Sequence, residues 1–176
     1  MKISHLLQRL VLCGPIVTVI YALKHRVLVS HKAEVELSPR VTIGRRTVIS
    51  SFSQVKTTGG GRLAIGERSA IGIGAHIVGG PGGVTLGDDC LVSQNVCIEG
   101  VNYRYDRLDQ TFAEQGQTSK GIKIADNVWI GANCVILDGA DIATGVIITP
   151  GSVVSGKIPA NAIATGNPAK VIFTRR

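Results

Sequence analysis

Aliphatic residues recur every six positions through most of the chain, beginning at Leu37. This spacing fits neither the two-residue alternation of an ordinary strand nor the 3.6-residue turn of a helix. It is typical of a solenoid in which each short strand places one aliphatic side chain inward. The sixteen in-phase positions form four runs: Leu37, Ile43, Ile49 and Val55; Ile65, Ile71 and Ile77; Leu86, Val92 and Ile98; and Ile124, Ile130, Ile136, Ile142, Ile148 and Val154.

Small residues stand at fixed places between these aliphatic positions. Glycine often follows the aliphatic residue, as in Ile43-Gly44 and Ile130-Gly131. Tight turns between short strands explain this, because such corners have room only for small side chains. Three strands and three corners predict a triangular coil of eighteen residues, stacked on the next coil at about 4.8 Å. The fourth residue after the aliphatic one is also often small, as at Thr47, Ser53, Ser69, Ala75, Cys90, Cys134, Ala140 and Ser152.

Three segments interrupt the repeat. Residues 57–61 and 79–83 are glycine-rich and predict small bulges at corners, whereas residues 99–121 predict a long loop inserted at one corner. A loop of that length in so compact a lattice is usually functional. The repeat therefore predicts an all-β solenoid domain over residues 35–176, with the loop as an insertion.

The N-terminal residues follow a different pattern. Residues 6–29 predict a mostly helical element, in which the uncharged run 10–23 is interrupted by Gly14-Pro15. This run is shorter than the roughly 20 apolar residues that cross a bilayer, and no signal-peptide cleavage site follows it. Two interpretations of residues 1–34 remain: a cap over the open end of the solenoid, or a segment attached to an anionic membrane surface.

Charge favours local binding patches over one continuous basic face. The net charge is +7; residues 1–46 hold eight Lys or Arg against two Glu, whereas residues 47–169 hold eight basic and ten acidic residues. This distribution argues against a nucleic-acid-binding protein and suits a membrane surface or a phosphorylated ligand. Aromatic residues make up only 4% of the chain, so the core must consist of small and β-branched side chains.

The cysteines form no C-x-x-C pair, and no histidine stands at metal-ligand spacing from them. We interpret Cys13, Cys90, Cys97 and Cys134 as small buried hydrophobic residues and expect neither disulfides nor a metal. This fits a reducing, cytoplasmic setting, at the inner face of the membrane if the N-terminal segment attaches there.

The stretch 121–136, GIKIADNVWIGANCVI, is similar to the signature of the hexapeptide-repeat acyltransferase superfamily, and residues 166–172, GNPAKVI, are similar to its C-terminal ending. The resemblance covers roughly residues 35–173 and is strongest to sugar and polysaccharide O-acetyltransferases of the galactoside and maltose acetyltransferase type. It implies a left-handed parallel β-helix, a homotrimer, acetyl-CoA as co-substrate, and an active site between two subunits. The loop, with Phe112, Gln115 and Gly116 in its returning half, would reach over a neighbouring subunit or serve only to pack the trimer.

One departure from the family concerns the catalytic base. Related enzymes carry Asn-His near the start of this loop, where this chain reads Asn102-Tyr103. An unperturbed phenol near pKa 10 is only about a thousandth ionised at neutral pH, which costs roughly 4 kcal/mol relative to a group that titrates near neutrality. Four alternatives remain open. In the first, Tyr103 beside Arg104 is itself the catalytic base, and in the second another side chain takes that role. In the third, the acceptor is an amine, which depends less on a catalytic base. In the fourth, the site is inactive. The replacement candidates are His76, Glu99 and Asp106.

Other site residues follow from the same resemblance. Trp129 would line the thioester or acceptor pocket, or would pack between subunits, and Asn95 would face the acceptor. In the six-residue register His76 stacks one coil below Cys97, close to where the loop leaves, although a lone histidine in a β-helix wall is more often structural. The histidines before the repeat, interpreted as basic surface or cap residues, are His5, His25 and His31.

CoA recognition in this family relies mostly on backbone groups of successive coils. By resemblance, the pantetheine arm would run along Ala132, Pro150, Gly151 and Ser155, and Lys170 would meet the phosphates. Many relatives have Thr-Lys where this chain has Ser155-Gly156, so one phosphate contact departs from the family pattern. No serine or cysteine stands beside a base as a covalent nucleophile, so we expect direct attack of the acceptor on the thioester, with a backbone N–H stabilising the oxyanion.

The resemblance therefore implies an acetyltransferase that moves an acetyl group from acetyl-CoA to a sugar or polysaccharide hydroxyl. Two alternatives remain. One is N-acetylation of an amino-sugar nucleotide, which the missing histidine favours. The other is a catalytically silent trimer that binds CoA or acts as a scaffold.

Overall fold

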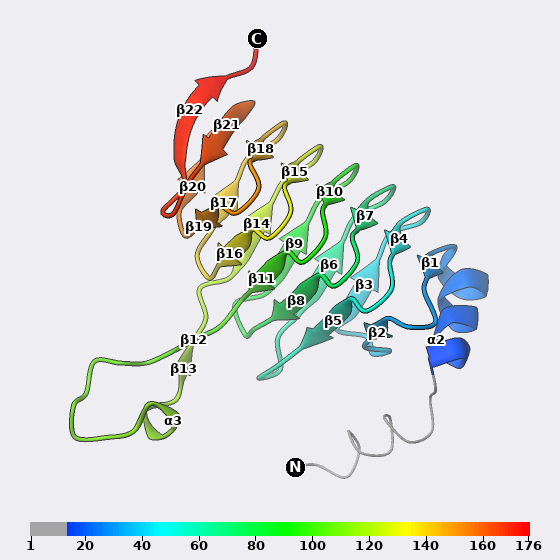
Figure 1. Ribbon diagram of the computed structural model, residues 1–176. Coiled ribbons are helices and arrows are strands. Elements are labelled where there is room, and N and C mark those ends of the chain that lie inside the picture. The colour runs from blue at the N-terminus through cyan, green and yellow to red at the C-terminus, as the bar shows by residue number, and fades with distance from the viewer. Residues whose placement is uncertain (1–13) are drawn as a thin grey trace.

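Three parallel β-sheets, here named A, B and C, enclose the interior of the protein (Figure 1). The computed structural model describes residues 14–176. Sheet A contains β1 (Leu28–Val29), β4 (Val48–Ile49), β7 (Ala70–Ile71), β10 (Leu91–Val92), β15 (Trp129–Ile130), β18 (Ile147–Ile148), β21 (Ala162–Thr165) and β22 (Lys170–Thr174). Sheet B contains β2 (Glu34–Val35), β5 (Gln54–Thr57), β8 (His76–Gly79), β11 (Cys97–Glu99), β16 (Val135–Leu137) and β19 (Val153–Val154). Sheet C contains β3 (Val41–Ile43), β6 (Leu63–Ile65), β9 (Val84–Leu86), β14 (Ile122–Ile124), β17 (Asp141–Ile142) and β20 (Lys157–Ile158).

The chain visits the sheets in a fixed order. It passes from A to B to C and then returns to A one coil further along, so β1 pairs with β4, β2 with β5 and β3 with β6. All pairs within the three sheets are parallel except β21 with β22, which is antiparallel and ends sheet A. This is the three-sided stack of coils that the six-residue repeat predicts.

The six-residue positions fill the interior of the stack. Fifteen of the sixteen aliphatic residues in the repeat are buried, and Leu37, near the N-terminal end, is partly buried against the same cluster. In the longer strands of sheet C a second side chain two positions earlier, such as Leu63 or Ile122, is also buried. The predicted core is confirmed.

Small residues at the corners link each coil to the next. The hydroxyl of Thr47 donates to the carbonyl oxygen of Gly66 at 2.7 Å, and the thiol of Cys134 donates to that of Thr149 at 3.0 Å. A buried donor costs stability unless it is hydrogen-bonded, and these donors find a backbone carbonyl one coil away. The corner positions therefore require a small side chain, and a hydroxyl or thiol there adds a link between coils.

The described cysteines follow this pattern. Cys90, Cys97 and Cys134 are free, and burial raises the pKa of all three thiols. Cys90 and Cys134 are buried, as predicted, whereas Cys97 is only half-buried because it lies on the outer face of sheet B beside His76. Cys13 lies outside the described residues.

Gly72 lies at a corner where the next coil passes closely. A Cβ atom added there would lie 2.6 Å from the carbonyl carbon of Ser93. We expect Gly72→Val to lower the free energy of unfolding by about 1–3 kcal/mol, because backbone rather than a flexible side chain must move. Chemical denaturation measures this, with Gly156→Ala as the control, since a Cβ there meets nothing within 4 Å. Equal stability of the two variants would contradict the close stacking.

A short helical segment closes the N-terminal end of the stack. α2 (Gly14–Ile20) continues into one π-helical turn, η1 (Tyr21–His25), and the buried side chains of Val17 and Tyr21 join the core. The hydroxyl of Tyr21 donates to the carbonyl oxygen of Glu36 at 2.9 Å. Among residues 14–176, no helix is long and apolar enough to cross a membrane.

The expected helical element at 6–29 ends earlier, at His25. Leu28 already pairs with Val48 in sheet A, and Glu34 pairs with Gln54 in sheet B. Strand pairing therefore begins before residue 35. The first coil starts there because the strands of the second coil need hydrogen-bonding partners on their N-terminal side. The part of this element before residue 14, with His5, lies outside the described residues.

Candidate active site

The inserted loop forms an arm, residues 100–121, that extends away from the three sheets (Figure 1). Within it β12 (Asn102–Tyr103) pairs antiparallel with β13 (Gln117–Thr118), and α3 (Phe112–Gln115) lies toward the tip. Glu99 still belongs to β11, so the arm begins one residue later than predicted. It leaves the stack between β11 and β14, which is the corner between sheets B and C.

The base of the arm is held by hydrogen bonds to neighbouring coils. The buried carboxylate of Asp138 accepts the backbone N–H groups of Lys120 and Gly121, each at 2.7 Å. The hydroxyl of Ser119 donates to the carbonyl oxygen of Gly100 at 2.5 Å and so joins the two ends of the arm. The direction in which the arm leaves the stack is therefore set by Asp138, which lies outside the arm, and by Ser119, which lies within it.

The arm is ordered internally although it is exposed to solvent. The side chain of Gln115 donates to the carbonyl oxygen of Arg107 at 2.9 Å and accepts its N–H at 3.0 Å. Thr111 and Glu114 form a capping box at the start of α3. The arm nevertheless leaves four large apolar or aromatic side chains exposed: Tyr103 (58%), Tyr105 (78%), Phe112 (66%) and Leu108 (102%).

The expected catalytic residues of the arm lie close to its base. Asn102 pairs with Thr118 in the hairpin, and Tyr103 follows it. Arg104 and Asp106 form an exposed ion pair, with 3.7 Å between Nε and Oδ1. Such a pair contributes little to stability, so both side chains are available for other contacts.

Trp129 lies on the outer face of sheet A, at the start of β15. Its side chain is 46% exposed, and its indole N–H donates to the hydroxyl of Ser93 at 3.3 Å. Asn95 follows Ser93 at the corner between sheets A and B, where its φ of 55° places it in the left-handed region. Asparagine tolerates this conformation better than most residues, so the backbone conformation alone explains why an asparagine stands at this corner.

Three of the five expected CoA-binding residues stack at this same corner. Ala132 accepts the backbone N–H of Gly151 at 2.9 Å, and Pro150 stands beside Gly151. Ser155 lies beyond β19, at the other end of that strand of sheet B. Lys170 is exposed at the start of β22, where it pairs with Thr165.

His76 lies on the outer face of sheet B, between Gln54 and Cys97 on the neighbouring strands. The stacking of His76 on Cys97 expected from the repeat is therefore present. Burial first and the positive charge of Lys56 second lower the pKa of its imidazole, against a smaller opposing effect of Glu34. On the same face, burial raises the pKa of the Glu99 carboxyl, and Lys56 partly offsets this. Both shifts favour the uncharged forms of these groups.

The lowered pKa of His76 predicts how stability changes with pH. The unfolded imidazole takes up a proton near pH 6.5, whereas the folded one does so only at lower pH. His76 therefore stabilises the fold above pH 6.5, and this contribution is lost as pH falls through the folded pKa. We expect the stability of wild type relative to His76→Gln to fall between pH 7 and pH 5 in urea unfolding. A difference that stays constant, or rises on acidification, would contradict this.

Within one chain the arm and the Trp129 corner lie apart. Trp129, Asn95 and Ala132 lie on or beside the corner between sheets A and B, whereas Tyr103 lies on an arm that leaves from the corner between sheets B and C. Sheet B separates the two. The arm residues and the residues of the Trp129 corner therefore form two groups, which meet if the arm of one copy reaches the corner of another. Three further predicted site residues belong to neither group: His76 on sheet B, Ser155 beyond β19 and Lys170 on β22. Among the described residues 14–176, no group of three or more His, Cys, Asp or Glu side chains could hold a metal ion.

Comparison with known proteins places these repeats in a family. Residues 121–156, which run from the end of the arm through β19, match the family model described as bacterial transferase hexapeptide (six repeats). The repeats of residues 121–156 are hexapeptide repeats of this family's type. The match covers the coils that carry Trp129, Ala132 and Gly151, and also Asp138 at the base of the arm.

Two curated relatives share part of the hexapeptide-repeat region. The chain is 32% identical over 118 residues to a polysialic acid O-acetyltransferase of Escherichia coli, which covers 67% of this chain and 38% of the relative. It is 36% identical over 90 residues to the galactoside O-acetyltransferase of Escherichia coli, covering 51% of this chain and 43% of the relative. The chain thus spans less than half the length of these relatives.

Solved structures share the fold. AntD, an N-acyltransferase from Bacillus cereus in complex with dTDP and 3-hydroxybutyryl-CoA, superposes with a TM-score of 0.76 at 21% identity, over 86% of this chain and 81% of AntD. The polySia-specific acetyltransferase NeuO superposes with a TM-score of 0.59 at 27% identity, over 84% of this chain and 71% of NeuO.

Sequence reasoning missed the residues that hold the arm. Asp138 and Ser119 fix its base, and the Gln115 side chain joins the two halves of the arm by donating to the carbonyl oxygen of Arg107. Asp138 carried a usable signal, since it is a charged residue two positions after the core residue Ile136, and side chains two positions apart on a strand share a face. A buried carboxylate needs hydrogen-bond donors, and the nearest sequence break that could supply them is the end of the loop.

Proposed function

We propose that this protein is an acetyltransferase that moves an acetyl group from acetyl-CoA to a hydroxyl of a sugar or polysaccharide, with its active site shared between copies. The observation that carries the proposal is the separation of the arm from the Trp129 corner in one chain. Relatives named as O-acetyltransferases of polysialic acid and of galactosides support the acceptor class. The hexapeptide-repeat match supports left-handed winding of the coils.

The outer face of sheet A from β10 onward supports assembly into a homotrimer. Side chains at the same register on consecutive coils form an apolar row there, and an apolar face of this length favours burial against a partner. The arm also exposes aromatic or aliphatic side chains at Tyr105, Leu108 and Phe112. These side chains of a neighbouring copy could pack against the apolar row. The row contains Leu91, Trp129, Ile147, Ile163 and Phe173.

The corner between sheets A and B exposes backbone that the pantetheine arm of a CoA thioester could approach. Pro150 and Gly151 are exposed, and a Cβ added to Gly151 would meet nothing within 4 Å, so a narrow chain can approach the backbone. We propose that the pantetheine arm runs past Ala132 and Gly151 toward Ser155. Lys170 would then meet the phosphates, where a cation is favourable.

The proposed reaction is a direct transfer. The acceptor oxygen attacks the thioester carbonyl carbon, the C–S bond breaks, the acceptor proton passes to a base, and the CoA sulfur leaves as a thiolate that is then protonated. A backbone N–H at the corner would stabilise the oxyanion. Four groups compete for the role of base: Tyr103 with Asn102 beside it, Asp106 on the arm, Glu99 at the end of β11, and His76, whose neutral imidazole can accept a proton at neutral pH.

N-acetylation of an amino-sugar nucleotide is the second candidate function. The observation that favours it is Tyr103, which stands where related O-acetyltransferases carry histidine. An amine attacks a thioester with less help from a base than a hydroxyl does, so the loss of the histidine would matter less.

The proposal is tested by incubating the protein with labelled acetyl-CoA and a panel of hydroxyl and amino sugars. Transfer to a hydroxyl sugar supports the first function, and transfer only to amino sugars supports the second. Tyr103→Phe, His76→Ala, Glu99→Gln and Asp106→Asn then identify the base, because among these only loss of the true base lowers kcat by about a hundredfold or more in a folded variant, and Tyr103→His tests whether the family's histidine restores it. Binding of CoA without transfer to any acceptor would contradict the proposal and indicate a silent scaffold.

A further inference from the structure

The outward face of the N-terminal helix is apolar. Ile16, Val19 and Leu23 lie at helical spacing and are 43%, 53% and 82% exposed, while Val17 and Tyr21 on the opposite side enter the core. A helix that only caps a solenoid needs a polar outer face to keep the end soluble. This helix caps the stack with one face and presents apolar side chains with the other.

Apolar surface continues from the helix onto the first coils. An open groove of ≈ 430 Å³ lies between the helix and sheet A, with Ala22 on one wall and Leu28, Val48 and Ile73 among the residues that line it. Phe52, at a corner beside this groove, is 67% exposed. The helix face and the coils thus form one apolar surface at this end of the molecule.

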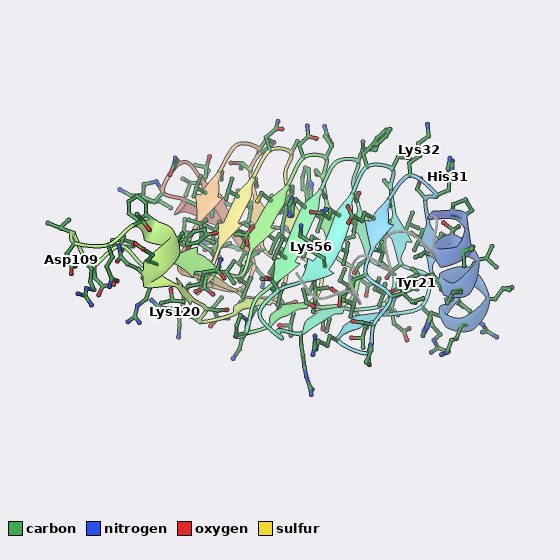
Figure 2. All side chains as sticks on the ribbon, turned by 90° about the horizontal axis from the view of Figure 1, so that it is seen from below. Tyr21, His31, Lys32, Lys56, Asp109 and Lys120 are labelled. Carbon is green, nitrogen blue, oxygen red and sulfur yellow. The ribbon has the colours of Figure 1, made fainter. Side chains whose placement is uncertain are left out.

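The helix and the strand that follows it carry charges of one sign, and the first acidic residues, Glu34 and Glu36, come after them on sheet B. Residues 14–33 contain Lys24, Arg26 and Lys32 and no Asp or Glu, and residues 1–13 add two basic residues and no acidic one. The Lys32 ammonium lies 5.5 Å from the centre of the Phe52 ring, so basic and apolar groups are interleaved. Figure 2 shows His31 and Lys32 at the end occupied by the helix, far from Asp109 on the arm.

We propose that this N-terminal surface, formed by the outward face of residues 16–23 and the Leu28, Val48 and Phe52 side chains, docks on an anionic phospholipid membrane. An apolar helix face flanked by lysine and arginine is the pattern of an interfacial helix, in which apolar groups enter the acyl boundary and basic groups meet the headgroups. The groove gives an acyl chain an apolar place to lie.

The charge pattern favours a membrane over a second copy of the chain. Two copies meeting face to face through this surface would bring Lys24, Arg26 and Lys32 toward their own equivalents, and like charges at an interface oppose association. An anionic membrane instead supplies the opposite charge. The proposal does not depend on the acetyltransferase function, because the surface lies at the helix end and not at the arm or the Trp129 corner.

Vesicle co-sedimentation of the full chain tests the proposal. We expect binding to vesicles of phosphatidylcholine with phosphatidylglycerol, about tenfold weaker binding to phosphatidylcholine alone, and weakening of the former by salt. The double variant Val19→Gln, Leu23→Gln should bind anionic vesicles at least about tenfold more weakly, and Lys24→Gln, Lys32→Gln should lose the preference for anionic lipid. Both pairs are exposed, and denaturant unfolding verifies that the variants fold.

Matched controls come from the opposite end of the molecule. Ile172→Gln removes an exposed apolar side chain and Lys157→Gln an exposed positive charge, and neither should change vesicle binding. The proposal is overturned if the wild type does not bind anionic vesicles or if the Val19, Leu23 variant binds them as the wild type does. If the wild type does not bind vesicles and the Val19, Leu23 variant changes the oligomeric state in sedimentation velocity, the surface is an interface between copies of the chain.

Discussion

Replacing Ile136 with alanine will lower the free energy of unfolding by about 3–4 kcal/mol. Ile136 is completely buried in β16 of sheet B, and its strand is paired with β11 on one side and β19 on the other. Truncation removes the transfer free energy of three carbon atoms and leaves a cavity that β-branched neighbours cannot easily fill. Since each coil covers its neighbours, the loss weakens the stack collectively. Chemical denaturation followed by circular dichroism measures the effect.

Val135 provides the matched control. It precedes Ile136 in the same strand but lies half-buried on the outer face of sheet B. Val135→Ala should cost less than about 1 kcal/mol, because little buried area is lost. Similar costs at the two positions would show that the inward and outward faces of the strand have been assigned wrongly.

Removing the arm or the Trp129 side chain will reduce acetyl transfer at least about a hundredfold. This follows if the acceptor is positioned by groups from both, because loss of positioning at a reacting centre commonly costs this much. Trp129→Ala should change the free energy of unfolding little, since nearly half of the side chain is exposed in one chain. Steady-state kinetics with acetyl-CoA and the best acceptor, together with denaturant unfolding, separate activity from stability.

The arm variant can be built without disturbing the stack. Asn102 and Thr118 are paired across the hairpin, so residues 103–117 can be replaced by an Asn-Gly turn. Asp138 and Ser119 would still hold the base. Trp129→Phe should retain much of the activity, because a ring remains to line the pocket. Wild-type rates in either the arm variant or Trp129→Ala would contradict the proposed site.

The solenoid core could be predicted from sequence because its cause is local and periodic. Every coil needs an aliphatic side chain at its inward position. Ile71, Ile130 and Ile148 can therefore be assigned to the core from the sequence alone, without knowing which residues they contact. The small corner residues follow for the same reason. Their hydrogen bonds could not be foreseen as directly, because the acceptor for Cys134 is a carbonyl one coil further along the chain.

The arm and the N-terminal helix were predicted less completely. The position of the arm follows from the break in the repeat, but its direction depends on Asp138, which meets the N–H groups of Lys120 and Gly121 only in the folded stack. The end of the helix depends on Leu28 pairing with the second coil. Both features are set by contacts between segments, which a six-residue pattern does not encode.

The measurement that tests the central claim most directly is activity in mixed assemblies of two inactive variants, the arm replacement and Trp129→Ala. If one copy supplies the arm and another the Trp129 corner, co-expressed variants should regain about a quarter of the wild-type rate, since random mixing pairs an intact arm with an intact corner at about one seam in four. A rate no higher than that of the separate variants would contradict a site shared between copies.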